Sequence, residues 1–471
     1  MKPYLLLFSG LLFSAVLAAQ DSTLTLTPER YFQWISAYHP LVLQANLLPA
    51  SAAASLLEAR GGFDPKLVSD VTQKSFDGKN YYTLTESGVK IPTLYGLELK
   101  GLFTTASGIR TNPENALPAA GQAVVGVKAT LGQGLFIDER RATLQKARIL
   151  QNANEAQRLE AVNNLLLEAG IAYWEWVKAF GKLRAIEQAL RLSQERLEGI
   201  VESFEQGDRP ATDTLEALVQ VQNWMFERNQ AVLDYQNAGF ALSNFLWDEN
   251  ETPLALAGNV SPPLPDTFNT GLPVSGLEDL VLLAQNQHPQ LQAYQFKLAQ
   301  LDVDRRLALE AFKPRVDVEY NLLGDGFRMG SGPGDGLNGL LLQNFKWGLN
   351  FSFPLFLRKE RGKLELTRLK VSEASLGLLQ KQLEIANKVR QAYNEWQNAQ
   401  QQIVVYESIV TNYRSLLEAE TTRFQLGESS IFLVNTREQK LIEAQIKLVG
   451  LRVDFQKNRL KTGWAAGRIN W

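Results

Sequence analysis

The chain has 471 residues, of which 45% are hydrophobic, and its formal net charge is −2 at neutral pH. A net charge this small provides no electrostatic field that would recruit nucleic acid or an anionic membrane surface. The chain contains no cysteine and only two histidines, which excludes disulfides, a lipid anchor on a thiol and Cys/His metal sites. We therefore expect a folded protein without cofactors.

Residues 1–20 predict a cleaved secretory signal peptide. Lys2 is followed by an apolar run over residues 4–17 and then by the small residues Ala18 and Ala19, which is the order of such signals. The apolar run is shorter than the ~20 residues that a membrane-spanning helix needs. We therefore expect the mature protein to be exported without an N-terminal membrane anchor.

The remaining chain is internally duplicated. His39-Pro40 recurs as His288-Pro289 at an offset of 249, whereas Leu135-Phe136 recurs as Leu355-Phe356 at an offset of 220. The first copy is therefore 29 residues longer between residues 65 and 135. We predict a first repeat over residues 21–260, a linker over 261–275 and a second repeat over 276–471, because duplication fixes the architecture in which all other signals are placed.

Each repeat predicts a short helix, strands, a very long helix and a return helix. The first repeat has its long helix at 138–206 and its return helix at 213–246; the second has helices at 289–311, 359–426 and 431–462. Apolar residues recur every seven positions along both long helices: Val162, Ala169, Trp176, Leu183, Leu190, Leu197 and Phe204, then Val389, Trp396, Ile403, Val410, Leu417 and Phe424. This period predicts helices that supercoil around neighbours, each about 100 Å long.

The strands are predicted at about 66–134 and 315–353. In residues 315–322 and 344–353 apolar and polar side chains alternate strictly, which fits either a soluble sheet or a membrane barrel. Strands of about ten residues with aromatic side chains on the apolar face favour the barrel. In the first repeat, residues 76–121 predict either an additional β-hairpin or a long surface loop.

Four strands, or even six, are too few for a single-chain membrane barrel, since these begin at eight. Open sheet edges are not tolerated in lipid. The chain must therefore close its barrel with copies of itself, and three copies of four strands give twelve.

A glycine ends each long helix. Gly207 and Gly427 lie in equivalent turns, at residues 204–210 and 424–430, and glycine is the usual residue just past a helix end. Each glycine is followed by residues whose side chains can cap the N-terminus of the next helix. The candidates are Thr212 or Asp213 in the first, and Ser429 or Ser430 in the second.

The chain resembles the TolC family of outer-membrane efflux proteins in several features. These are the duplicated order, the paired helix starts and strand ends, the arginines that follow the strand ends (Arg141 and Arg361), and the paired glycine turns. The resemblance covers nearly the whole mature chain. It implies an α+β membrane protein that forms a homotrimer, with a 12-stranded β-barrel in outer-membrane lipid and an α-helical barrel extending into the periplasm. It also implies a periplasmic adaptor (membrane fusion) protein and an inner-membrane pump as partners.

The resemblance also implies which residues gate the periplasmic end. The gate aspartate of the family corresponds to Asp213, preceded by Thr212. The family's tyrosine and arginine in the second turn correspond to Phe424 and Ser429, so the gate's charges differ here. The family's lumen aspartates correspond to Leu433 and Thr436, Arg209 and Arg423 are candidates to replace the missing arginine, and Gly207, Gly427, Phe204 and Phe424 are candidates for adaptor docking. Asp213 has the alternative role of a helix N-cap.

These observations predict an outer-membrane exit duct of a tripartite pump. The alternatives are the outer-membrane component of a type I protein secretion system and, in a different class, a periplasmic coiled-coil structural protein. The sequence contains no nucleophile elbow, phosphate loop or metal-ligand spacing, so we expect no enzymatic activity.

Overall fold

The computed structural model describes residues 24–111, 116–271, 276–329 and 341–469. The expected signal peptide at 1–20 therefore lies outside the described residues. The chain divides into two compact units. Unit 1 comprises Met1–Asn46, Arg158–Pro289 and Gln382–Trp471, and unit 2 comprises Leu47–Gln157 and Gln290–Lys381. Both units contain segments of both repeats, so the compact units do not coincide with the repeats read from the sequence.

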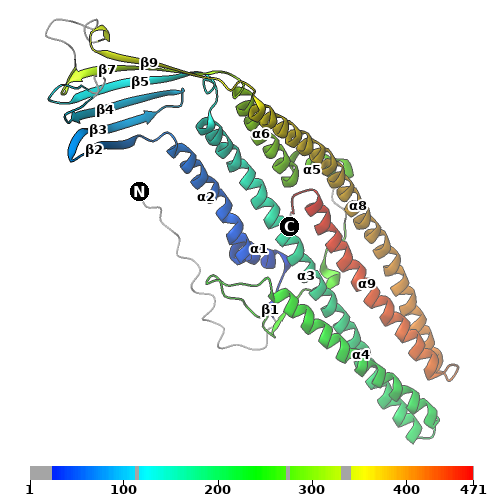
Figure 1. Cartoon of the computed structure of the whole chain (residues 1–471). Helices are drawn as coiled ribbons and strands as arrows, with labels where there is room; N and C mark the ends of the chain where they lie inside the picture. Colours follow the sequence, from blue (N-terminus) through cyan, green and yellow to red (C-terminus); the bar gives the residue numbers. More distant parts are fainter. Residues whose placement is uncertain (1–23, 112–115, 272–275, 330–340, 470–471) are drawn as a thin grey trace. The chain divides into compact units, whose positions relative to one another are not determined.

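The helices follow the two sequence offsets (Figure 1). The first repeat contains α1 (Pro28–Tyr38), α2 (Pro40–Gly61), α3 (Glu139–Glu205) and α4 (Ala211–Ser243), and the second contains α5 (Leu277–Gln287), α6 (Pro289–Glu310), α8 (Arg358–Gln425) and α9 (Ile431–Ala465). A short 3-10 helix, Pro265–Thr267, lies between them. Helices α1 and α5 were not predicted. They end at His39 and His288, where a proline starts the next helix. Each histidine thus occupies a junction between two helices.

The interior of unit 1 is formed by the apolar residues that recur every seven positions along the long helices. In α3, Ala169, Trp176, Leu183 and Leu190 are buried, and in α8 Val389, Trp396, Ile403 and Val410 are buried. Trp176 and Tyr173 belong to one core cluster with Tyr31 and Phe32 of α1. The aromatic pairs on the long helices therefore serve helix packing, as their helical spacing indicated.

Unit 2 contains an antiparallel sheet in the order β2-β3-β4-β5-β7-β9 (Figure 1). Its long strands are β2 (Lys66–Phe76), β3 (Lys79–Pro92), β4 (Leu97–Ser107), β5 (Gln122–Gly132), β7 (Arg315–Asp325) and β9 (Phe345–Ser352). The short β8 (Arg328–Met329) pairs with the end of β7. In unit 1, β1 (Leu24–Thr25) and β6 (Val260–Ser261) form a separate parallel pair.

The number of strands differs from the sequence prediction. The four strands expected for each chain are wrong, because the described sheet contains six long ones. Strands β3 and β4 form the extra hairpin, which runs from Lys79 to Ser107 and thus has the length of the 29-residue insertion. Its turn is closed by the Thr93 N–H, which donates to the Leu97 carbonyl at 2.8 Å, and by Gly96 at φ +76°. Of the two alternatives for residues 76–121, the hairpin is therefore confirmed.

The buried tyrosines of unit 1 predict how stability depends on alkaline pH. The Tyr173 hydroxyl donates to the Leu26 carbonyl at 2.8 Å, and the Tyr31 hydroxyl donates to the Ala169 carbonyl at 3.2 Å. Burial raises the pKa of Tyr31 and of Tyr173 above the ordinary value of about 10. The unfolded chain therefore loses these protons first, and stability falls as the pH rises above about 10.

We expect the melting temperature in detergent to be level up to about pH 10 and to fall above it. The double variant Tyr31→Phe/Tyr173→Phe should be less stable at pH 8, by about 1 kcal/mol for each hydrogen bond removed, and should show a shallower alkaline fall. An alkaline fall as steep as that of the unmodified chain would contradict the assignment to these two tyrosines.

Candidate functional site

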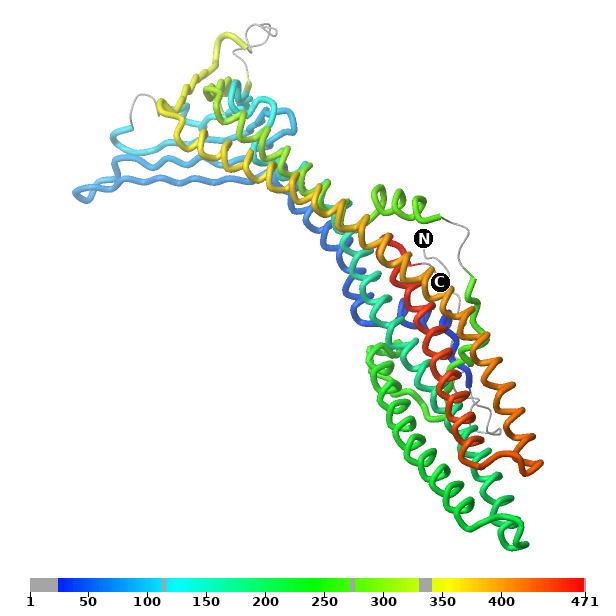
Figure 2. Tube along the Cα trace, turned by 90° about the vertical axis from the view of Figure 1, so that its right-hand side faces the viewer, coloured from blue at the N-terminus to red at the C-terminus, as the bar shows by residue number. Residues whose placement is uncertain are grey.

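The two turns that join the long helices to their return helices lie at the same end of unit 1 (Figure 2). We call residues 204–210 the first turn, residues 424–430 the second turn, and both together the tip. In the first turn, the Gly207 N–H donates to the Phe204 carbonyl and the Asp208 N–H to the Ser203 carbonyl, each at 2.9 Å.

The second turn repeats this pattern. The N–H groups of Gly427 and Glu428 donate to the carbonyls of Phe424 and Arg423. The two glycines have φ values of +81° and +77°, a conformation that is costly for other residues. Both turns are therefore the same glycine-dependent helix end.

Arg209 links the first turn to the second. Its Nη2 donates to the Phe424 carbonyl at 2.9 Å, and its guanidinium carbon lies 4.0 Å from the centre of the Phe424 ring. Its Nη1 is also 3.8 Å from Oδ2 of Asp213. The hydrogen bond and the cation–π contact fix the two turns against each other. The ion pair with Asp213 lies within the first repeat.

Asp213 is not a helix N-cap, the alternative role that its sequence position allowed. Helix α4 begins at Ala211 and is capped by Pro210 without a side-chain hydrogen bond. Thr212 and Asp213 are therefore helical residues, just after the start of α4. A carboxylate there interacts favourably with the helix dipole. Thr212 is exposed. In the second turn, Ser430 is the N-cap of α9, and its hydroxyl accepts from the Leu433 N–H at 3.4 Å.

Glu420 organises the charges around the second turn, and sequence reasoning missed it. This buried carboxylate accepts from the Ser429 hydroxyl. It also lies 3.8 Å from Arg423 and 3.7 Å from Arg437. Arg423 therefore pairs within its own repeat, whereas Arg209 reaches the other turn.

A second missed group lies between α3 and α9. Arg196 Nη1 binds Oε2 of Glu438 and donates to Oδ1 of Asn435 at 3.1 Å. The Glu438 residue is 1% exposed, and its Oε1 has no hydrogen-bond partner among the described residues. A buried carboxylate is costly unless it is paired. The sequence signal was the placement of two polar residues, three apart, on the stripe of α9 that continues with Leu441 and Ile442.

The outside of the tip carries apolar side chains. Leu426 in the second turn is 70% exposed, and Phe432 at the start of α9 is also exposed. Phe204 is exposed as well, whereas Phe424 is partly buried and packs with Ile200, Ala217 and Ile431. The tip therefore offers an uncovered apolar surface, of which Phe204 forms part and Phe424 does not.

In unit 2, the charged residues of the sheet lie on only one of its two faces. The strand registers place all charged residues of the regular ladders on one face: Lys66, Asp70, Lys74, Glu86, Lys90, Glu98, Lys100, Lys128, Arg315, Asp317, Glu319 and Lys346. The opposite face carries large apolar residues, of which Leu67 is 85% and Trp347 is 62% exposed. An apolar face of this kind, left uncovered, marks contact with a membrane or a partner.

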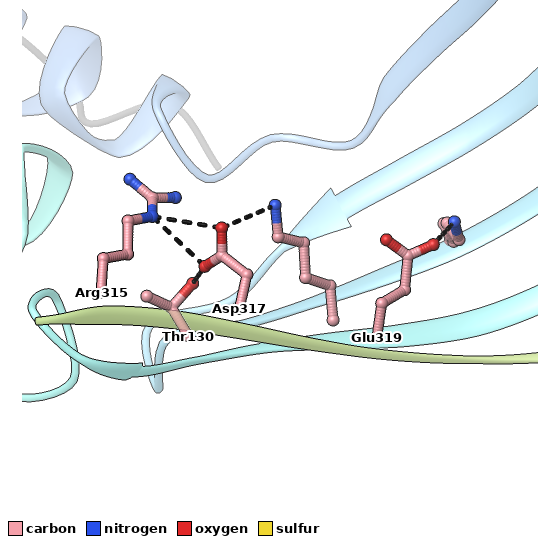
Figure 3. A network of polar contacts seen from close by, with 6 residues as sticks. Thr130, Arg315, Asp317 and Glu319 are labelled. Atoms are coloured by element: carbon pink, nitrogen blue, oxygen red, sulfur yellow. Dashed lines mark hydrogen bonds and ion pairs between the residues drawn. The ribbon is translucent and has the colours of Figure 1, made fainter. Parts of the chain in front are cut away.

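The charged face is held by ion pairs that cross several strands (Figure 3). Asp317 accepts from the Thr130 hydroxyl at 2.8 Å and from Arg315 Nε at 3.1 Å. Lys128 lies 3.4 Å from the same carboxylate, and Lys100 of β4 pairs with Glu319 of β7. These pairs stabilise the strand order from β4 to β7, because oppositely charged side chains on the same face of a sheet attract.

Within the described residues, no group of three or more His, Asp or Glu side chains is arranged to hold a metal ion. Unit 1 presents the tip as one candidate site, and unit 2 presents the amphipathic sheet as another.

Comparison with known proteins shows what this chain resembles. Residues 280–461 match the family model of the outer membrane efflux protein. No curated protein matches the chain. The resemblance to the TolC family that the sequence motifs indicated is thereby confirmed, and the family match agrees with the expectation that the chain is not an enzyme.

Several solved outer-membrane channels share the fold. The CmeC channel of Campylobacter jejuni is 16% identical with a TM-score of 0.62, over 93% of this chain and 85% of that one. The outer membrane protein VceC of Vibrio cholerae is 14% identical with a TM-score of 0.62, over 93% and 96%. The open-state MtrE channel of Neisseria gonorrhoeae is 13% identical with a TM-score of 0.65, over 93% and 88%.

The interactions of Arg209 predict that its replacement loosens both turns. In Arg209→Met, we expect amide hydrogen exchange to accelerate about 5- to 30-fold in residues 424–428 as well as in 204–210, since the hydrogen bond and the cation–π contact of Arg209 are together worth about 1–2 kcal/mol. Arg423→Met is the matched control, because Arg423 pairs within its own repeat. It should leave exchange in the first turn unchanged. Equal effects of both variants on the first turn would contradict the link.

Proposed function

We propose that this chain, whose residues 280–461 match the outer membrane efflux protein family, is the outer-membrane exit duct of a tripartite export system. One observation carries the proposal. The sheet has strands of membrane-crossing length, with charges on one face and uncovered apolar side chains on the other. This is the pattern of a barrel with lipid outside and water inside.

The duct is a homotrimer. Strands β2 and β9 end the sheet, and neither has a second partner strand among the described residues. In a bilayer every backbone N–H and C=O must be hydrogen-bonded, so an open edge is excluded. Copies of the chain supply the missing partners, as the TolC resemblance implies. Unit 1 of each copy then contributes its long helices to a helical barrel in the periplasm.

The tip is the gate of this duct and the docking surface for a periplasmic adaptor. Arg209 holds the two turns of each copy together through the Phe424 carbonyl and ring, and Asp213 pairs with Arg209 within the first repeat. Glu420, with Arg423 and Arg437, holds the second turn. The exposed Leu426, Phe432 and Phe204 form the apolar surface on which an adaptor binds. An inner-membrane pump provides the energy.

Ion conductance tests the gate. In planar bilayers, we expect the purified trimer to conduct poorly, and we expect Asp213→Ala and Arg209→Ala to raise the conductance several-fold, because each removes a partner of the tip ion pair. Arg368→Ala serves as the control, since its ion pair with Glu365 lies on the exposed surface of α8, far along the sequence from the tip. It should leave the conductance unchanged.

Two outcomes would contradict the proposal. A water-soluble monomer with no affinity for detergent, found by size-exclusion chromatography with light scattering, would favour a coiled-coil structural protein instead. A trimer whose conductance is the same with and without Asp213 and Arg209 would assign the gate to other residues.

A further inference from the structure

We infer that three copies of this chain close an eighteen-stranded barrel, in which the β3–β4 hairpin is part of the membrane wall and β9 of each copy pairs with β2 of the next. The inference rests on the trimeric duct proposed above and concerns the number of strands in its wall. It replaces the twelve strands expected from the sequence, because that number assumed four strands per chain.

The inserted hairpin has the length of two membrane crossings. Strand β3 has 14 residues and β4 has 11, and a tilted barrel strand needs about 9–11 residues to cross a bilayer. β3 pairs with β2 along eleven positions and with β4 along ten. The hairpin therefore lies within the sheet, between β2 and β5, and is not a loop beyond its end.

The hairpin continues both faces of the sheet. On the apolar face, Val89 of β3 stands opposite Leu67 of β2, and Leu99 of β4 opposite Val127 of β5. All four side chains are exposed. On the charged face, Lys90 is opposite Lys66 and Lys100. A surface loop has no need of this separation, whereas a strand between lipid and water requires it.

An ion pair fastens the hairpin to the strands of the second repeat. Lys100 of β4 reaches Glu319 of β7 across the intervening strand β5. The residue of β5 opposite Lys100 is Gly126, which also pairs with Asn321, whereas Glu319 is opposite Lys128. A Cβ at Gly126 would lie 2.9 Å from Cε of Lys100 and 2.0 Å from Oδ1 of Asn321, so the absence of a side chain leaves room for the pair.

Strand parity allows the larger barrel to close. Six alternating strands run from β2 to β9, so β2 and β9 are antiparallel to each other. When copies are joined edge to edge, β9 meets an antiparallel β2, and every junction keeps the antiparallel pattern. An insertion of one strand would break this alternation, whereas a hairpin of two preserves it.

The consequence is a wider pore. Barrel diameter grows roughly linearly with strand number, so eighteen strands give a diameter about one and a half times that of twelve. Barrels of 16–18 strands leave an aqueous channel. The membrane pore of this duct is therefore suited to cargo larger than a twelve-stranded barrel of the same design admits.

Electron cryomicroscopy of the full-length chain in lipid nanodiscs tests the strand number directly. Viewed along the threefold axis, the barrel should show eighteen strands. A trimer with twelve strands and the hairpin outside the wall would overturn this inference and leave the proposed duct intact. Particles without threefold symmetry would overturn the duct itself, so the two failures are distinguishable.

A matched pair of substitutions on β3 provides the second test. Val89→Arg places a charge on the apolar face, whereas Leu84→Arg places it on the charged face, since Leu84 is opposite Thr72 and Ala106. A charge facing lipid in the membrane disfavours insertion, but a charge facing the lumen does not. We expect at least about tenfold less membrane-inserted trimer for Val89→Arg than for Leu84→Arg. Equal recovery of the two variants would overturn the inference, because it would show that β3 does not face lipid.

Discussion

The backbone of a sheet in a bilayer must have all its hydrogen bonds satisfied by protein, and the rest of this architecture depends on that requirement. One chain provides six long strands with open edges at β2 and β9, so a single copy is incomplete in lipid. Under the proposed function, closure by identical copies sets the symmetry of the pore. The long helices of the copies then have the same symmetry, because α3 follows β5 and α8 follows β9 in each copy.

At the tip, the two repeats have the same backbone geometry but different side chains. Both long helices end in the same glycine turn, because a left-handed backbone at Gly207 and Gly427 is needed to reverse the chain. Arg209 and Ser429 are equivalent positions at the offset of 220, yet only the arginine contacts the opposite turn. The position equivalent to Arg209 in the second turn thus carries a hydroxyl in place of a guanidinium, so the link between the turns is made from the first turn only.

The sheet shows the complementary case, in which the two repeats differ in size. An insertion in one long helix would displace its glycine turn along the helix axis relative to the other turn, and Arg209 could then no longer reach Phe424. An insertion between β2 and β5 has no such effect, because a hairpin adds two strands at the side of the sheet and leaves the ends of the neighbouring strands in place. The 29 additional residues thus lie where the fold tolerates them.

The sequence by itself determined the duplication, the long helices, the glycine turns and the place of the length difference. Each of these depends on local signals: a repeated motif, an apolar stripe of period seven, or a residue that tolerates positive φ. The alternation in residues 315–322 likewise determined the two faces of β7.

Only the tertiary structure decided whether the insertion is a hairpin in the sheet, because that depends on pairing with β2 and β5, which are brought together by the fold. It also decided the partners of Arg209 and Glu420. Their roles follow from which side chains face each other across separate helices, and charge partners distant in sequence leave no periodic signal.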